Sequence, residues 1–228
     1  MGSGGGSEIV SLDAREIHVW VARTDADVRE LARILSDDER DRAARFRFED
    51  DQRRSIVARA TLRTLLARYL DRDPHQLHFT LGPQGKPALA TSEIEFNVSH
   101  SGEYVLLAFA RESPVGVDVE TEKRTSDMLA ISERYFSPAE AEEVRNASNI
   151  AAAFYKTWTA KESVIKAAGG GLSIDLTSFR VTPSSTFTRV ESDLLAEWSV
   201  QMLPSPGDGY HAAVAARGSD WTTIVRVH

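Results

Sequence analysis

The chain of 228 residues contains no cysteine, which excludes a disulfide framework, a thiolate zinc site and a cysteine nucleophile. This composition suits a reducing compartment, so we expect a cytoplasmic protein. Long apolar runs are also missing, because the longest spans only residues 104–110 and is far too short to cross a membrane. Basic residues are outnumbered, and the net charge of −7 argues against general nucleic-acid binding. Neither a membrane nor a nucleic acid is therefore an expected partner.

Hydrophobic residues make up 42% of the chain and charged residues 27%, so the sequence can bury a substantial core. The length fits one large domain or two small ones that pack together. Residues 1–7 read MGSGGGS and have neither the charged start nor the apolar core of a signal peptide. We interpret them as an appended tag and leave them out of the fold.

Helical and strand-like patterns alternate along the chain. Apolar residues recur at helical spacing over 52–69 and 151–168, and the second stretch stops at three consecutive glycines. Strand-like segments are expected at 17–22, 96–101, 104–111 and 115–120, within the hairpin-like stretch 78–89, and in several pieces after residue 172. This order favours an α+β fold with mainly antiparallel sheets, divided into an N-terminal subdomain at 8–111 and a C-terminal subdomain at 112–228.

The first candidate functional segment is VGVDVE at 115–120. Strand periodicity puts its three valines on one face and Gly116, Asp118 and Glu120 on the other. Two carboxylates one strand repeat apart, beside a glycine without a side chain, could hold a hard cation. An amphipathic strand with its polar face in water would have the same pattern, so the segment alone leaves both interpretations open.

The second candidate is the helical segment WTAKESVIKAAGGG, which begins at Trp158. Trp158, Glu162 and Lys166 are spaced four residues apart and lie along one side of the helix, with Lys161 next to Glu162. A glutamate and a lysine at this spacing are also an ordinary helix-stabilising pair, and a lone tryptophan usually packs into a core.

Two further segments could bind anions. The stretch NVSHS places Ser99 and His100 among small polar groups that could hold a phosphate, although a single histidine at a strand end is more often structural. Arginines outnumber acidic residues over 33–72. Arg42, Arg53 and Arg54 flank the start of an apolar helix and could form an anion cradle, or they could be solvated helix surface.

The order of these segments is more specific than any one of them. GKP at 85–87, FNVSHS, GVDVE and WTAKESVIKAAGGGL together resemble the 4′-phosphopantetheinyl transferases, specifically the larger, pseudo-dimeric, surfactin-synthetase-activating type. The resemblance runs from about Leu35 to Leu176. It implies a monomer of two similar α/β subdomains related by a pseudo-two-fold axis, with the active site in the cleft between them.

Members of this family move the 4′-phosphopantetheine arm of coenzyme A (CoA) to a serine of an apo acyl or peptidyl carrier protein and release adenosine 3′,5′-bisphosphate. By resemblance, Asp118, Glu120 and Glu162 would hold Mg²⁺, for which Mn²⁺ can substitute, together with the pyrophosphate of CoA. Glu162 would deprotonate the serine, directly or through water. Lys166 would neutralise the pyrophosphate and assist departure of the bisphosphate. The KES variant resembles enzymes that serve polyketide, non-ribosomal peptide and some fatty-acid carriers.

The resemblance also implies contacts to the rest of CoA. Ser99 and His100 match phosphate-contacting positions, with His100 at the 3′-phosphate. Further CoA contacts are expected from Asp118 and Lys166 and from four residues of the N-terminal subdomain: Arg42, Ser55, Lys86 and Pro87. Lys86 and Pro87 belong to a turn against the adenine, with Lys86 near the phosphates. Glu39 stands where some relatives carry a basic residue, so Arg40 or Arg53 would assist Arg42. Trp158 is expected to support the catalytic helix rather than touch the substrate.

A carrier-docking surface is expected over 123–149, where charges mix with apolar residues, although plain packing would also explain this composition. Two alternatives to the transferase are an inactive CoA-binding module and a metal-dependent pyrophosphohydrolase that cleaves CoA with water. The carboxylates and lysine argue against a mere binder, and the chain has no separate hydrolase signature.

Overall fold

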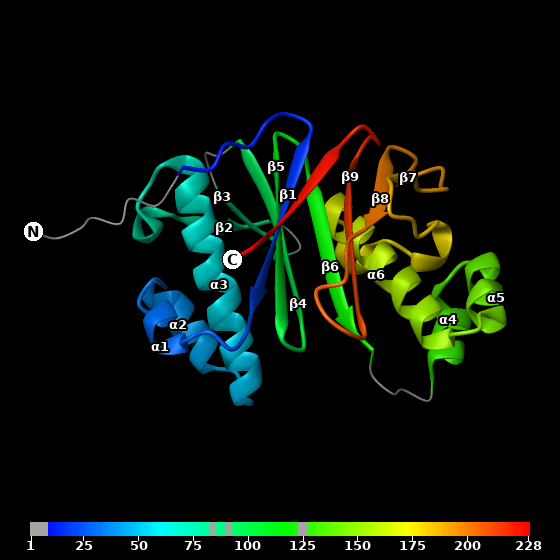
Figure 1. The fold of residues 1–228 in the computed structure, drawn as a ribbon, viewed down its shortest axis with the longest axis horizontal. Helices are drawn as coiled ribbons and strands as arrows, with labels where there is room; N and C mark the ends of the chain where they lie inside the picture. Colours follow the sequence, from blue (N-terminus) through cyan, green and yellow to red (C-terminus); the bar gives the residue numbers. More distant parts are fainter. Residues whose placement is uncertain (1–8, 83–84, 90–92, 123–126) are drawn as a thin grey trace, which may run out of the picture.

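The computed structural model describes residues 9–82, 85–89, 93–122 and 127–228. Two sheets pack face to face, and each is covered on its outer face by one long helix (Figure 1). The layers therefore follow the order helix, sheet, sheet, helix. Within the described ranges, no helix is both long and apolar enough to cross a membrane.

The first sheet has the strand order β10-β1-β5-β4 and includes the N-terminal strands. Its strands are β1 (Glu16–Arg23), β4 (Ile94–Ser101), β5 (Tyr104–Arg111) and β10 (Thr222–Val227). Helix α3 (Glu49–Leu70) covers its outer face, preceded by α1 (Val28–Ala32) and α2 (Asp37–Ala44). A short 3-10 helix (Pro74–Gln76) and a hairpin of β2 (Phe79–Leu81) and β3 (Pro87–Leu89) complete this part.

The second sheet is antiparallel and has the order β6-β9-β8-β7. Its strands are β6 (Val115–Thr121), β7 (Thr188–Arg189), β8 (Trp198–Met202) and β9 (Tyr210–Arg217). Helix α6 (Ile150–Ala168) covers its outer face, and α4 (Met128–Tyr135) and α5 (Pro138–Asn146) pack beside that helix. Two 3-10 turns follow α6, at Gly171–Ser173 and Leu176–Ser178.

The core between the sheets explains the pattern of strand β6. Val115, Val117 and Val119 are fully buried there, against apolar side chains of β1 and β5. The alternate residues of β6 therefore face helix α6, as the period of two in the sequence predicts. The α+β fold with two subdomains, each a sheet with helices, is confirmed.

The predicted boundary of the C-terminal subdomain is wrong at its far end. Strand β10 leaves that subdomain and pairs with β1 of the first sheet, parallel to it, with Glu16 opposite Thr222. Without β10, the edge of β1 would present unpaired backbone groups to solvent. The last strand therefore joins the two subdomains, and it is the exception to the antiparallel pairing.

Candidate active site

Side chains, rather than a backbone ladder, connect strands β4 and β6 where the two sheets meet. The backbone N–H groups of Val117, Val119 and Thr121 donate to Asn97 Oδ1, Ser99 Oγ and Ser101 Oγ over 2.9, 3.3 and 3.2 Å. Every second residue of NVSHS thus satisfies one N–H of β6, which would otherwise be an exposed edge. This register brings Ser99 next to Asp118 and Ser101 next to Glu120.

Helix α6 supplies the opposite wall of the site. The Asn149 side chain caps its first turn by accepting the N–H of Ala152, and the helix ends at Gly169 with a positive φ of 72°. Its long apolar face packs on the second sheet. Trp158, Glu162 and Lys166 lie along another side of the helix, which faces the junction of β4 and β6. The sequence spacing of these three residues predicts this arrangement.

Asp118, Ser99 and Lys166 form a compact polar cluster. Lys166 Nζ lies 2.6 Å from Asp118 Oδ1 and donates to Ser99 Oγ at 3.0 Å. Ser99 Oγ donates in turn to Asp118 Oδ1 at 2.8 Å, and Ser101 Oγ donates to Glu120 Oε2 at 3.0 Å. Asp118 is only 3% exposed, and its Oδ2 has no hydrogen-bond partner among the described residues. A buried carboxylate oxygen without a partner is costly unless a cation or a donor binds it.

The electrostatics of the carboxylates favour a bound cation. Burial raises the pKa of Asp118, and the Lys166 ammonium works against this rise. Burial also raises the pKa of Glu162, and the negative charges of Asp118 and Glu120 raise it further. Within the described part of the chain, no group of three histidine or acidic side chains is already arranged to hold a metal. The three carboxylates nevertheless line one pocket.

This central pocket has a volume of about 330 Å³. It is lined by Val98, Ser99, His100, Asp118, Glu120, Trp158, Glu162 and Lys166. Six of the eight residues are predicted site residues, which the fold brings together from both subdomains. Trp158 stacks on Phe154 of the same helix and also lines the pocket.

An arginine pocket of about 260 Å³ adjoins the central pocket through the shared residues Val98 and His100. The predicted site residues Arg42 and Ser55 line it, and so does Arg59, which sequence reasoning missed. Arg59 Nη1 is buried and has no hydrogen-bond partner in the described ranges, and burial lowers the pKa of this guanidinium. Arg59 follows Ser55 by one helical turn, and this spacing was a usable signal.

Glu39 holds Arg59 of this pocket and the neighbouring Arg63 in place. Its carboxylate pairs with Arg63 Nε at 2.7 Å and Arg59 Nε at 3.5 Å, and it completes a capping box with Ser36. His100 lines both pockets, and desolvation of its partly exposed ring lowers its pKa, which the positive charge of Arg54 lowers further. The lining of the pocket therefore carries more positive than negative charge, with Arg42 and Arg59 against Glu39.

An apolar pocket of about 680 Å³ adjoins the central pocket through Val98, Glu162 and Lys166. Its wall includes Lys86, Pro87, Val98, Tyr135, Glu162, Lys166, Gly169, Gly171, Ser173, Ile174, Asp175 and Leu176. The Lys86 ammonium donates to the carbonyls of Val115 at 3.2 Å and Lys166 at 3.3 Å. Burial lowers the pKa of Lys86. Through its bond to the Lys166 carbonyl, this side chain connects the first subdomain to the end of α6.

The two arginines expected to assist Arg42, Arg53 and Arg40, make other contacts. Arg53 lines none of these three pockets of the described structure, because its guanidinium points to the carbonyls of Thr24 and Ala26, at 3.5 and 3.3 Å. Arg40 binds the carbonyl of Leu35 and the carboxylate of Asp37. Both side chains thus secure local backbone and helix structure, and Arg59 stands where they were expected.

Comparisons with known proteins agree with this geometry. A family model described as 4′-phosphopantetheinyl transferase, N-terminal, matches residues 19–112, and the 4′-phosphopantetheinyl transferase superfamily model matches 114–215. The transferase HetI of Nostoc sp. is 33% identical over 93% of this chain and 92% of its own length. Sfp of Bacillus subtilis is 33% identical over 65% of this chain and 66% of its own.

Among solved structures, the ACPS–CoA complex of Chronobacterium ammoniagenes covers 46% of this chain and 97% of its own, at 20% identity and a TM-score of 0.35. The two family models meet near the predicted subdomain boundary, and the relatives are matched over most of the chain. The chain therefore belongs to the 4′-phosphopantetheinyl transferase family, and it is a two-domain enzyme of the type that activates carrier proteins.

Proposed function

We propose that this chain takes the 4′-phosphopantetheine arm from CoA, attaches it to a serine of an apo acyl or peptidyl carrier protein, and releases adenosine 3′,5′-bisphosphate. One observation carries the proposal: an arginine pocket, a carboxylate pocket and an apolar pocket adjoin one another around Val98. CoA has three matching parts, namely a phosphorylated nucleoside, a pyrophosphate and a long arm of low charge. The three pockets suit these parts in that order.

The arginine pocket is the proposed site of the 3′-phosphate. Arg42 and Arg59 supply positive charge there, and Ser55 and His100 supply donors for phosphate oxygens. The unpartnered Nη1 of Arg59 supports this assignment, because a phosphate oxygen would satisfy a buried donor that the described protein groups leave unpaired. Pro87 lines both this pocket and the apolar one, so it can contact the nucleoside.

The central pocket is the proposed site of the pyrophosphate and Mg²⁺. Asp118, Glu120 and Glu162 would hold the ion, since hard divalent cations prefer carboxylate oxygens and the orphaned Asp118 Oδ2 lacks any other partner in the described structure. When bound, Mg²⁺ supplies charge neutralisation on the pyrophosphate, and Mn²⁺ takes the same oxygen ligands. Ser99 and His100 lie beside these carboxylates and would contact the phosphates.

Glu162 and Lys166 are the proposed catalytic residues. Glu162 accepts the proton of the carrier serine, directly or through a water. The serine oxygen then forms a bond to the phosphorus that bears the pantetheine arm, and the bond from that phosphorus to the bridging oxygen breaks. Lys166 stabilises the charge that develops on the departing bisphosphate.

The apolar pocket would receive the pantetheine arm, and the carrier would dock beside it. Residues 123–126 of the proposed docking surface lie outside the described residues. In the rest of that segment, Met128, Ile131 and Phe136 pack against Phe154 and Trp158. Leu129 and Tyr135 are the exposed large apolar residues of the segment, and Tyr135 also lines the apolar pocket. We therefore narrow the proposed docking surface to this exposed side of α4.

The direct test is intact-protein mass spectrometry of several unrelated apo carriers incubated with this protein, CoA and Mg²⁺. We expect one carrier or more to gain the mass of phosphopantetheine, and we expect EDTA to abolish the gain because the carboxylate pocket needs its cation. CoA consumed without carrier modification would identify a pyrophosphohydrolase instead. CoA bound without any gain would identify an inactive binder.

Arg59→Met tests the arginine pocket. Loss of a charge-assisted contact is expected to weaken binding of adenosine 3′,5′-bisphosphate about 10-fold or more, whereas AMP, which lacks the 3′-phosphate, should lose little. Calorimetric titration of both nucleotides measures the difference. Arg72→Met is the matched control, since Arg72 is exposed beyond the far end of the same helix. Equal weakening of both nucleotides would contradict the assignment of the 3′-phosphate.

A further inference from the structure

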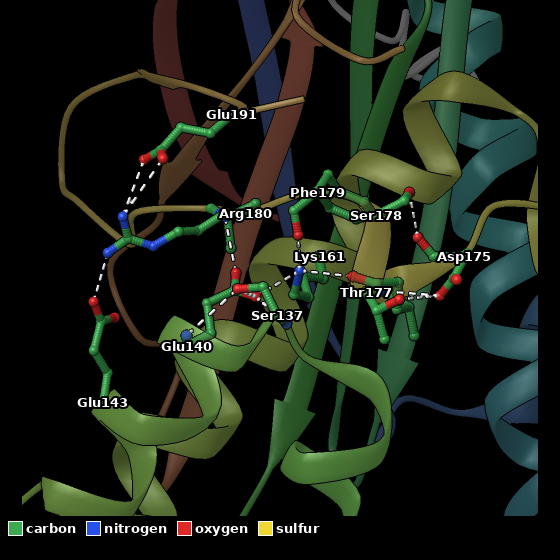
Figure 2. Close-up of polar contacts among 12 residues, drawn as sticks. Ser137, Glu140, Glu143, Lys161, Asp175, Thr177, Ser178, Phe179, Arg180 and Glu191 are labelled. Carbon is green, nitrogen blue, oxygen red and sulfur yellow. Dashed lines mark hydrogen bonds and ion pairs between the residues drawn. The ribbon is translucent and has the colours of Figure 1, made fainter. Parts of the chain in front are cut away.

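Lys161 lies next to the proposed base Glu162 in the sequence, and its side chain points toward Glu140 and the carbonyl of Phe179 (Figure 2). It is completely buried and lines none of the three pockets in the described part of the chain. Desolvation disfavours the ammonium form of a buried lysine, so Lys161 needs acceptors within the protein to stabilise its charge. Desolvation does lower its pKa, and the charge of Glu140 opposes the change.

The contacts of Lys161 use its full hydrogen-bonding capacity. Its Nζ lies 2.8 Å from Glu140 Oε2, donates to the Leu176 carbonyl at 2.9 Å, and donates to the Phe179 carbonyl. These three acceptors match the three N–H donors of an ammonium group. The ring centroid of Phe179 lies 4.1 Å from Nζ, within range of a cation–π contact.

Glu140 is equally well satisfied and extends the network to two other elements. Its Oε2 accepts the backbone N–H of Ser137 at 2.9 Å and the Ser137 hydroxyl at 2.8 Å, which completes the capping box of α5. Its Oε1 accepts the backbone N–H of Val181 at 2.9 Å. Glu140 is 1% exposed, so the whole ion pair is out of contact with water.

The pair therefore joins helix α6, the first turn of α5 and the segment 176–181 (Figure 2). That segment directly continues a wall of the apolar pocket, to which Ser173, Ile174 and Leu176 contribute. Leu176 belongs to both the hydrogen-bond network and the pocket wall: its carbonyl accepts from Lys161, and its side of the chain lines the pocket that Glu162 and Lys166 also line. Lys161 thus fixes how far this wall stands from the catalytic side of α6.

We propose that Lys161, paired with Glu140, is a positioning residue that sets the width of the apolar pocket and thereby the affinity for the arm of CoA. This inference rests on the proposed function in assigning the arm to that pocket. A fully buried ion pair is weak support for a gain in stability, because well-packed apolar residues are often as good. Apolar residues, however, cannot donate to the carbonyls of Leu176 and Phe179.

The test uses Lys161→Met alone and combined with Glu140→Gln. The single variant leaves a buried, uncompensated carboxylate, so its Tm should fall. The combined variant removes both charges and keeps the capping box, since glutamine also serves at that position, and its Tm should largely recover. Lys156→Met on the exposed side of α6 and Glu142→Gln on the exposed side of α5 are the matched controls.

The decisive readout is calorimetric binding of two nucleotides to the combined variant. We expect the Kd for CoA to rise about 10-fold, while the Kd for adenosine 3′,5′-bisphosphate, which lacks the arm, stays within about twofold. Hydrogen exchange of the amides over 174–181 should accelerate, and the controls should change neither quantity. These measurements need no transfer activity, so they remain decisive even if the chain modifies no carrier.

Two results would overturn the inference. A combined variant with restored Tm and unchanged CoA affinity would show that the pair serves the fold alone. Equal loss of affinity for CoA and for the bisphosphate would show that the whole cleft has loosened, and not one wall of one pocket.

Discussion

Asp118→Asn is expected to lower kcat/KM for phosphopantetheine transfer by about 100-fold to 1000-fold while the fold survives. Asparagine has the shape of aspartate but no charge, so it can neither pair with the Lys166 ammonium at 2.6 Å nor give an anionic ligand to a cation. Glu162→Gln should have an effect of similar size, because an amide cannot accept the serine proton. The rate at which the carrier gains mass measures kcat/KM for each variant, and thermal unfolding checks that each variant still folds.

A control and an independent readout separate the site from a general effect. Asp193→Asn makes the same chemical change on an exposed loop and should leave transfer unchanged. Calorimetric titration of Mg²⁺ in the presence of CoA should show weaker binding in Asp118→Asn, with no turnover required. Full activity of either site variant at physiological Mg²⁺ would contradict the assignment of the carboxylates.

The parts of the site that depend on local periodicity could be predicted from the sequence. A strand has a period of two, so the alternation in VGVDVE fixes that Asp118 and Glu120 share a face opposite the buried valines. A helix has a period of 3.6, so the spacing of Glu162 and Lys166 fixes that they line one side. The structure then places both faces on one pocket.

The parts that depend on contacts between distant segments could not be predicted in this way. Whether Arg53 or Arg59 enters the arginine pocket depends on which side of α3 meets β4. The sequence alone does not distinguish these two arginines of one helix. The parallel pairing of β10 with β1 brings together strands that are far apart in the sequence, and no local sequence pattern predicts it. Likewise, Lys86 bonds to the carbonyls of Val115 and Lys166 only because two subdomains meet there.

Gly116→Ala is expected to cost about 3 kcal/mol of unfolding free energy or more, at the upper end of what overpacking does. A Cβ at this position would lie 2.1 Å from the carbonyl oxygen of Ser163 and 2.4 Å from the backbone nitrogen of Ala167. These are backbone atoms of α6, so a side-chain rotation cannot relieve the clash, and the helix itself must move away from β6. Urea unfolding monitored by circular dichroism measures the loss.

The same substitution also tests how closely stability and catalysis depend on one contact. Glu162 and Lys166 directly precede Ser163 and Ala167 on α6, whereas Asp118 lies on β6 two residues after Gly116, so a shift of the helix moves Glu162 and Lys166 away from Asp118. Transfer should therefore fall about 100-fold even at temperatures where the variant is still folded. Gly82→Ala is the matched control, because a Cβ there would stay 3.5 Å from the nearest backbone oxygen. A Gly116→Ala variant as stable and as active as the wild type would mean that α6 and β6 do not approach each other this closely in solution.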